Sequence, residues 1–286
     1  LFPYTTLFRS WYIREIEQPA GFVLDDTVYP VSIGKDGQVV EIKIVNKYVR
    51  GNIHLTKVDS EYPDNKLTGA TFEVYKDSNA NGKLDSGDEL LGTLTEKEKG
   101  EYSMNDLFYG RYFVKETKAP EGFVLDTGVY EVMIDTNGKT YEVENKAGVG
   151  FINEAMRGNL KIVKTSSDGK VKGFAFRITG ANGYDIILET NDKGEIFIDG
   201  LRIGDYTISE VSNSASSMYV LPADKEATVK LGSTTIVEMH NVLRDTPKTG
   251  DTTNLPLLYA LAGLSAVGIA VCGVIGFKKK KKEDRN

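Results

Sequence analysis

The fold of this chain is decided by a stretch that occurs twice, YFVKETKAPEGFVLD at residues 112–126 and WYIREIEQPAGFVLD at residues 11–25. A second pair recurs at a similar distance, VNKYVRGNIHLTK at residues 45–57 and INEAMRGNLKIVK at residues 152–164. A more diverged copy of the first stretch includes GDYTISE at residues 204–210. Because self-similarity at a regular spacing indicates repeated structural units, the chain is expected to contain tandem copies of one module.

Each copy alternates apolar and polar residues, as at Ile53 and Leu55, and Gly, Asn and Asp separate the alternating runs. This period of two is typical of β-strands that turn one face to a core. Short strands at such spacing, with no convincing 3.6-residue period before the C-terminal region, favour antiparallel sandwiches. The predicted fold class is therefore all-β, with tandem immunoglobulin-like β-sandwich modules.

The repeats also set the expected domain boundaries. Residues 11–49 match only the last part of a module, whereas residues 50–155 and 156–243 each match a complete one. Residues 1–10 read LFPYTTLFRS, which resembles the translation of a DNA-sequencing adapter, and they are left out of the fold prediction. The chain is accordingly expected to be a fragment of a longer protein.

The C-terminal region predicts export. Residues 255–277 are apolar apart from Ser265 and are long enough to cross a hydrocarbon core of about 30 Å as a helix. The tail at residues 278–286 begins with five consecutive lysines. Since basic residues beside a spanning helix stay on the cytoplasmic side, the modules should lie outside the cell, followed by a single C-terminal transmembrane helix.

The linker at residues 244–254 contains a pentapeptide that, placed before an apolar helix and a basic tail, resembles a sortase sorting signal. Its residues are Thr246, Pro247, Lys248, Thr249 and Gly250. The resemblance implies that a sortase cysteine attacks the Thr249 carbonyl and joins Thr249 to an amine of peptidoglycan. Such signals usually begin with Leu, so the sortase class stays open. The alternative interpretation is a single-pass membrane protein with a chance turn at this sequence.

Charge and cysteine content narrow the possible functions. The chain has 35 Lys and Arg against 41 Asp and Glu, a formal charge of −6 that grows more negative without the basic tail. With no basic patch apparent, nucleic acid is not an expected partner. The single cysteine, Cys272, lies in the apolar run, so the exported part has no disulfide of its own and any covalent cross-link must use other side chains.

Three polar residue types recur at strand positions where alternation favours an apolar side chain: a Lys on the first strand, a Glu on a late strand and an Asn on the last. The predicted sets are Lys57, Glu116 and Asn153, then Lys164, Glu210 and Asn241, with Glu15 and Asn46 in the partial module. Asn145 competes with Asn153, which the linker alignment with Asn46 favours. The alternative interpretation is that all of these residues are solvated.

At these positions the chain resembles the collagen-adhesin B-type (CnaB-type) and SpaA-like pilin repeats of Gram-positive surface proteins, most specifically in ETKAPEGF at residues 116–123. The resemblance implies a spontaneous isopeptide bond between Lys and Asn, with Glu as the catalytic acid and loss of ammonia. Burial is expected to favour the neutral amine and the neutral carboxyl. Each module reacts once, so no turnover enzyme and no required cofactor are expected. The last module departs from the pattern because Val-Ser-Asn-Ser follows Glu210.

Residues 77–88 follow the ligand spacing of a calcium-binding loop. The candidate metal ligands, with Ca²⁺ as the candidate ion, are Asp77, Asn79, Asn81, Asp85 and Asp88. An acidic turn without metal gives much the same pattern. The only histidines, His54 and His240, have no metal-ligand spacing, and His54 is expected on the sheet face opposite Lys57.

Together these features favour a cell-wall-anchored stalk on a Gram-positive bacterium, cross-linked inside its modules, that presents an adhesive N-terminal region. One alternative is a pilus subunit polymerised by sortase, although no Tyr-Pro-Lys-type element is present. Another is the anchor region of a surface enzyme whose catalytic domain lies upstream. The expected partners are sortase, peptidoglycan and, before sorting, the membrane. Host extracellular matrix and other pilins are further candidate partners.

Overall fold

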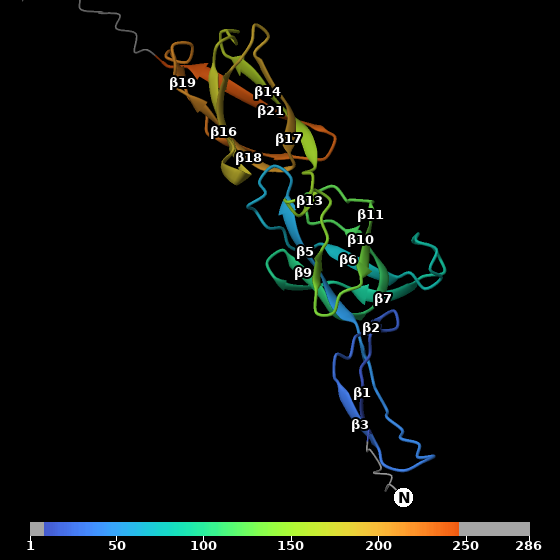
Figure 1. Cartoon of the computed structure of the whole chain (residues 1–286). Coiled ribbons are helices and arrows are strands. Elements are labelled where there is room, and N and C mark those ends of the chain that lie inside the picture. Colours follow the sequence, from blue (N-terminus) through green and yellow to red (C-terminus); the bar gives the residue numbers. More distant parts are fainter. Residues whose placement is uncertain (1–8, 246–286) are drawn as a thin grey trace, which may run out of the picture.

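The computed structural model describes residues 9–245. Apart from one short 3-10 turn, its regular elements are β-strands, which confirms the all-β prediction for this part of the chain. The strands form three groups in a row, with the N-terminal end at one extreme (Figure 1). No helix within residues 9–245 has the length and apolar character needed to cross a membrane. The sorting pentapeptide at 246–250, the apolar run at 255–277 and the basic tail lie outside the described residues.

The first group consists of two small antiparallel sheets, in which β1 pairs with β3 and β2 pairs with β4. These strands are β1 (Arg9–Ile13), β2 (Phe22–Val23), β3 (Tyr29–Ile33) and β4 (Lys47–Tyr48). Apolar side chains of this group, such as Trp11, Tyr12 and Ile16, are exposed. Within residues 9–245, the two apolar core clusters lie in the groups that follow.

The second group is a sandwich of two sheets, ordered β11-β10-β6-β7 and β12-β5-β9-β8, with β13 also paired to β5. Its strands are β5 (Arg50–Asp59), β6 (Thr71–Lys76), β7 (Glu89–Thr93), β8 (Thr95–Glu98), β9 (Glu101–Phe108), β10 (Gly110–Lys118), β11 (Val129–Ile134), β12 (Thr140–Glu142) and β13 (Phe151–Asn153). Between the sheets, the ring of Phe72 meets those of Tyr102 and Phe151 edge-on, a favoured aromatic geometry.

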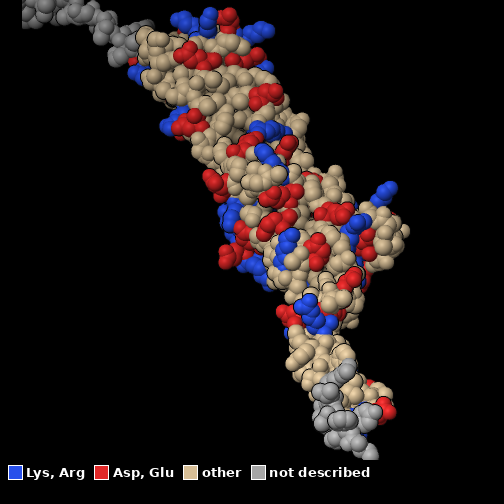
Figure 2. Space-filling model, viewed as in Figure 1, with Lys and Arg blue, Asp and Glu red and all other residues tan. Residues whose placement is uncertain are grey.

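The third group is a sandwich of four strands on four, ordered β17-β14-β21-β19 and β16-β15-β18-β20. Its strands are β14 (Arg157–Ser166), β15 (Ala175–Gly180), β16 (Asp185–Glu189), β17 (Glu195–Arg202), β18 (Gly204–Val211), β19 (Tyr219–Val220), β20 (Lys225–Val229) and β21 (Thr234–Leu243), and the 3-10 turn is η1 (Ala181–Gly183). Its core is separate from that of the second sandwich. Figure 2 shows acidic and basic side chains interspersed over the face that it displays.

The sequence repeat has a structural counterpart at the short turns that carry the chain from one sheet to the other before β10 and β18. Gly110 and Gly204 have φ angles of 147° and 135°, a backbone conformation that residues other than glycine rarely adopt. Two residues later, the hydroxyl of Tyr112 donates to the Phe108 carbonyl at 2.7 Å, and that of Tyr206 donates to the Arg202 carbonyl at 2.9 Å. The aligned residues therefore build the same turn in both sandwiches.

The first and last strands of each sandwich run parallel and are hydrogen-bonded neighbours. In the second sandwich β5 pairs with β13, and in the third β14 pairs with β21. Since residues in register on neighbouring strands point to the same face, this topology brings side chains from opposite ends of a module together. It is the reason that the predicted Lys and Asn lie near each other.

Candidate isopeptide sites

The six predicted residues of the two complete modules are all buried, although each is polar or charged. They are Lys57, Glu116 and Asn153 in the second sandwich and Lys164, Glu210 and Asn241 in the third. Lys57 and Glu116 have no exposed surface. Because lysine and glutamate are almost never fully buried without partners, the interpretation of these residues as solvated strand positions is wrong.

In the second sandwich, the three residues come from β5, β10 and β13. Lys57 is in register with Phe151, two residues before Asn153 on the neighbouring strand. The Lys57 amine donates to the Phe151 carbonyl at 3.0 Å. The side-chain amide of Asn153 donates from Nδ2 to Glu116 Oε2 at 2.7 Å. The amine, the carboxyl and the carboxamide thus share one buried site.

The third sandwich repeats this arrangement with β14, β18 and β21. Lys164 is in register with Met239, again two residues before the asparagine, Asn241. Asn241 Nδ2 donates to Glu210 Oε1 at 2.6 Å, and the Lys164 amine donates to the carbonyl of Thr165. The hydrogen bond from Asn241 to Glu210 therefore forms although the segment after Glu210 lacks Pro-Glu-Gly.

The partial module keeps the glutamate and asparagine of the same site. Asn46 Nδ2 donates to Glu15 Oε1 at 2.6 Å, and the backbone amide of Asp25 donates to Glu15 Oε2 at 2.7 Å. Glu15 and Asn46 are only half-buried. The pair is thus assembled in a more solvated environment than its counterparts.

Burial shifts the site toward its uncharged form. It lowers the pKa of Lys57 to about 8, although the charges of Glu116, Asp126 and Asp59 oppose this shift. Burial also raises the pKa of Glu116 against the opposing effect of its hydrogen bond with Asn153. The same cause lowers the pKa of Lys164 and raises the pKa of Glu210. A neutral amine beside a neutral acid is therefore accessible.

Two buried acceptor atoms without a hydrogen-bond partner occur at each site. In the second sandwich they are Glu116 Oε1 and Asn153 Oδ1, and in the third they are Glu210 Oε2 and Asn241 Oδ1. Buried polar groups without partners are rare in folded proteins. A proton on the carboxyl turns one unmet acceptor of each pair into a donor for the other. The repeated pattern thus favours a protonated glutamate that polarises the amide carbonyl.

The sequence alone did not reveal an adjoining network around Asp126. The backbone amide of Asp126 donates to Glu116 Oε2 at 2.8 Å, while its side chain accepts from Tyr130 Oη at 2.8 Å and from Asn145 Nδ2 at 2.7 Å. Burial and the bond to Asp126 raise the pKa of Tyr130 to about 12, so the hydroxyl remains a donor. Asn145 is thereby engaged away from Glu116. A usable signal existed, because the repeated stretch ends in the equivalent residue, Asp25.

Residues 77–88 form a turn held by its own polar groups. Asp77 accepts from the backbone amides of Asn81 at 3.1 Å and Gly82 at 3.0 Å, and the Asn81 side chain donates to Asp85 at 2.6 Å. Within residues 9–245, no group of three or more His, Cys, Asp or Glu side chains is arranged to hold a metal ion. Calcium binding by Asp77, Asn79, Asn81, Asp85 and Asp88 stays a prediction.

The histidine prediction is confirmed for His54. Burial alternates along β5, with Lys57 inside and His54 on the opposite face. There the imidazole lies between two carboxylates, with Nε2 2.9 Å from Glu101 and Nδ1 2.7 Å from Glu142. His54 therefore belongs to the outer surface of the sheet and takes no part in the buried site.

The fold and the buried sites define a protein of tandem β-sandwich modules in which a lysine, a glutamate and an asparagine meet inside each complete module. A comparison with known families matches residues 51–147 and 158–242 to the SpaA prealbumin-like fold domain. The chain belongs to this family, and the predicted resemblance to SpaA-like repeats is confirmed.

Several known proteins are similar to parts of this chain. The trypsin-resistant surface T6 protein of Streptococcus pyogenes is 30% identical over 196 residues, which are 66% of this chain and 32% of that protein. The chain thus spans about a third of that relative's length. The structure of the Bacillus anthracis TIE protein matches 82% of this chain and 42% of its own, with 25% identity and a TM-score of 0.62. The minor pilin of Streptococcus agalactiae matches 70% of this chain and 98% of its own, with 19% identity and a TM-score of 0.33.

Proposed function

We propose that Lys57 and Asn153, and likewise Lys164 and Asn241, form intramolecular isopeptide bonds that strengthen a surface stalk. The observation that carries this proposal is the buried hydrogen bond from Asn to Glu in both sandwiches, with the Lys on the neighbouring strand. The modules have no cysteine, so this chemistry takes the place that disulfides occupy in other exported proteins.

The reaction is an exchange of amides. The neutral Lys57 amine attacks Asn153 Cγ, a new Cγ–Nζ bond forms, and the Cγ–Nδ2 bond breaks. Glu116 lends its proton to the amide oxygen, accepts a proton from the attacking nitrogen and delivers that proton to the departing nitrogen. It recovers its own proton from the oxygen as the carbonyl re-forms. Ammonia leaves, and Glu116 ends as it began, so no oxidant, metal or cofactor enters the balance.

The pair of Lys57 and Glu116 reacts when it holds a single proton, located on Glu116. The same overall charge also exists as an ammonium beside a carboxylate, and burial in the core favours the neutral arrangement of the two. Because the two forms differ only in where one proton lies, the reactive fraction depends on the local field at the amine. The charged groups around Lys57 therefore set the rate of closure.

The position of each bond gives it a mechanical role. Lys57 lies on the first strand of its sandwich and Asn153 on the last. In the third sandwich the corresponding strands, β14 and β21, are paired in register over eight residues. A pull between the ends of a module would load the covalent link before it separated the hydrogen-bonded strands. Modules closed in this way suit a stalk that carries tension.

We further propose wall attachment through Thr249, with sortase and peptidoglycan as partners and a transient transmembrane stage at residues 255–277. The proposal is supported by the order of pentapeptide, apolar run and lysines in the sequence. Membership of the SpaA family and similarity to a streptococcal surface protein support a location on the cell surface. An adhesive region upstream, with host matrix as its ligand, completes the proposed stalk.

A second candidate function is a pilus subunit, which membership of the SpaA family also supports. A pilin would form covalent ladders with a pilus sortase through a specific exposed lysine, whereas a stalk would be joined once to the wall. Incubation with each class of sortase and substitution of the exposed lysines separates the two functions. The full gene would reveal whether a catalytic domain makes the chain the anchor region of a surface enzyme.

Proteolysis and tandem mass spectrometry test the cross-links. The proposal predicts a branched peptide that joins the segment of Lys57 to that of Asn153, and a second that joins Lys164 to Asn241. Glu116→Gln should abolish only the first branched peptide, while the exposed control Glu98→Gln should leave both. Linear peptides containing free Lys57 and free Asn153 from the unaltered chain would refute the proposal.

A further inference from the structure

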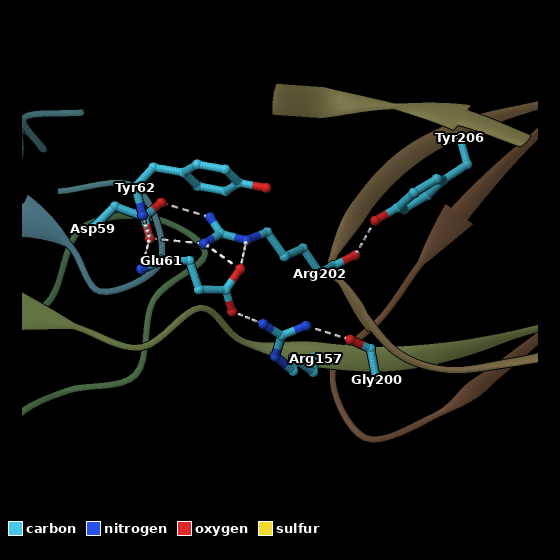
Figure 3. A network of polar contacts seen from close by, with 7 residues as sticks. All are labelled: Asp59, Glu61, Tyr62, Arg157, Gly200, Arg202 and Tyr206. Carbon is cyan, nitrogen blue, oxygen red and sulfur yellow. Dashed lines mark hydrogen bonds and ion pairs between the residues drawn. The ribbon is translucent and has the colours of Figure 1, made fainter. Parts of the chain in front are cut away.

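A charged contact joins the second sandwich to the third (Figure 3). Arg202, the last residue of β17, reaches across to the end of β5, where its Nη1 lies 2.6 Å from Asp59 Oδ2 and its Nη2 lies 2.7 Å from Asp59 Oδ1. The same guanidinium donates to Glu61 at 2.8 and 3.0 Å. Arg157, at the start of β14, also pairs with Glu61. Two arginines of one module thus hold two carboxylates of its neighbour.

Asp59 is the buried centre of this contact. Its side chain has no exposed surface, whereas that of Arg202 keeps 16%. The guanidinium also lies over the rings of Tyr62 and Phe123, 4.9 and 5.9 Å from their centroids. A bidentate ion pair of this kind is strong, but either partner left alone would be a buried charge that destabilises the fold. Asp59 therefore depends on the third sandwich for its counter-ion.

The same carboxylate flanks the proposed isopeptide site. Asp59 follows Lys57 by two residues on β5, so both side chains leave the same face of the strand. Across the sheet, Asp59 is in register with Asn153, and the Ser60 backbone amide donates to the Asn153 carbonyl at 3.1 Å. Asp59 is thus a neighbour of both residues that react.

Arg202 occupies the oxygens that would otherwise attract the lysine. Asp59 Oδ1 also accepts from the backbone amide of Glu61 at 2.9 Å, but within residues 9–245 the hydrogen-bond partner of Oδ2 is Arg202 alone. The Lys57 amine donates instead to the carbonyls of Phe151 and Val58. Among residues 9–245, the fully buried lysines are Lys57 and Lys164. Without Arg202, the one that shares a strand with Asp59 is Lys57.

We infer that Arg202 is a positioning residue for bond closure in the preceding module: by neutralising Asp59, it prevents this carboxylate from holding Lys57 as an ammonium. The inference rests on the proposed isopeptide function. It implies that the second sandwich closes at full speed only after the third has folded and docked against it. Maturation of the stalk would then require correct packing of neighbouring modules.

The charged groups that face Lys57 show in which direction the loss of Arg202 would change the rate of closure. They are Asp59 on its own strand, Glu116 on β10 and Asp126 in the loop after β10. Asp126 is neutralised in part by donors from Tyr130 and Asn145, which leaves Asp59 as the carboxylate whose compensation comes from another module. An uncompensated Asp59 shifts the shared proton from Glu116 to Lys57, and the reactive fraction falls about tenfold for each unit that the pKa of Lys57 rises.

The aligned position at the preceding junction is not charged. Phe108 occupies the place of Arg202 in the repeat, and it packs against the ring of Tyr48 at 5.4 Å and under the guanidinium of Arg50 at 3.8 Å. The ionic contact is therefore specific to the junction of the second and third sandwiches. Similar linkers thus join their modules by different chemistry.

The rate of closure tests this inference. Whole chains made by cell-free synthesis are sampled during a chase, and peptide mass spectrometry follows each bond separately. In Arg202→Met the second-sandwich bond should form at least several-fold more slowly than in the unaltered chain, while the Lys164–Asn241 bond should form at its normal rate and show that the third sandwich is folded. Asp59→Asn, and Asp59→Asn combined with Arg202→Met, should close at least as fast as the unaltered chain. Arg177→Met, which removes an exposed arginine of the same module, should change neither rate.

Each outcome separates the possibilities. Normal closure of the second sandwich in Arg202→Met would overturn the inference. So would a double variant as slow as Arg202→Met, because Arg202 would then act through packing alone. If Arg202→Met also unfolds the third sandwich, Asp59→Asn still tests the inference. Removal of the Asp59 charge should not slow closure of the second sandwich, so slower closure in Asp59→Asn would contradict the inference. Absence of both bonds from the unaltered chain would refute the proposed function itself.

Discussion

Replacing Lys57 with methionine distinguishes a cross-linked core from an ordinary buried ion pair by the sign of the stability change. Methionine has a similar length and fills the same space, with no charge to desolvate. If Lys57 were only a buried cation beside Glu116, the substitution would be neutral or would stabilise the fold by about 1 to 4 kcal/mol. If Lys57 is joined to Asn153, the substitution opens a covalent loop of nearly a hundred residues.

The chain-entropy model gives about 4 to 5 kcal/mol for a loop of this length. For a module of this size, that loss corresponds to a fall of roughly 15 to 40 °C in the midpoint of its thermal transition. Differential scanning calorimetry of the whole chain measures this transition, and Lys118→Met, at an exposed position of β10, is the matched control. A midpoint for Lys57→Met equal to or above that of the unaltered chain would refute the proposed bond.

Three further predictions concern the same module. Asn153→Ala should eliminate its cross-linked peptide, whereas Asn145→Ala should retain it, and tandem mass spectrometry would expose the opposite assignment. Closure should be roughly constant between the pKa of Glu116, which burial raises, and about pH 8, and should fall about tenfold per pH unit above pH 8, because burial lowers the pKa of Lys57 to about 8 and the pair then loses its one shared proton. Below the pKa of Glu116 the pair holds a second proton, and closure should slow again. A chase at several pH values checks this, and a rate that keeps rising to pH 10 would contradict it. Calcium should raise the thermal midpoint of the second module, and Asp88→Asn should remove that increase. Calorimetry in calcium and in a chelator measures the difference, and equal midpoints in the two conditions would contradict calcium binding by the loop.

Repetition is the reason that much of the architecture was predictable. Alternation at residues such as Ile53 and Leu55 specified strands, and both lie fully buried in the core of the second sandwich. The buried polar set was also accessible, because Lys57, Glu116 and Asn153 recur in order in the next module. A buried charge interrupts the alternation in each copy, and its recurrence made the pattern informative.

What the sequence did not reveal depends on contacts without a repeated signal. Arg202 aligns with Phe108, so nothing in the repeat marks it as the partner of Asp59 in the preceding module. The choice between Asn145 and Asn153 required knowing that Asn145 donates to Asp126. Both features arise from how loops and neighbouring modules meet in space, which strand periodicity does not encode.

The intact mass of the purified chain tests the proposed cross-links most directly. Closure of both sandwiches predicts a mass lower than that of the sequence by two ammonia molecules, with one of them regained in Glu116→Gln. A mass equal to that of the uncross-linked sequence would contradict the covalent sites and the mechanical role derived from them.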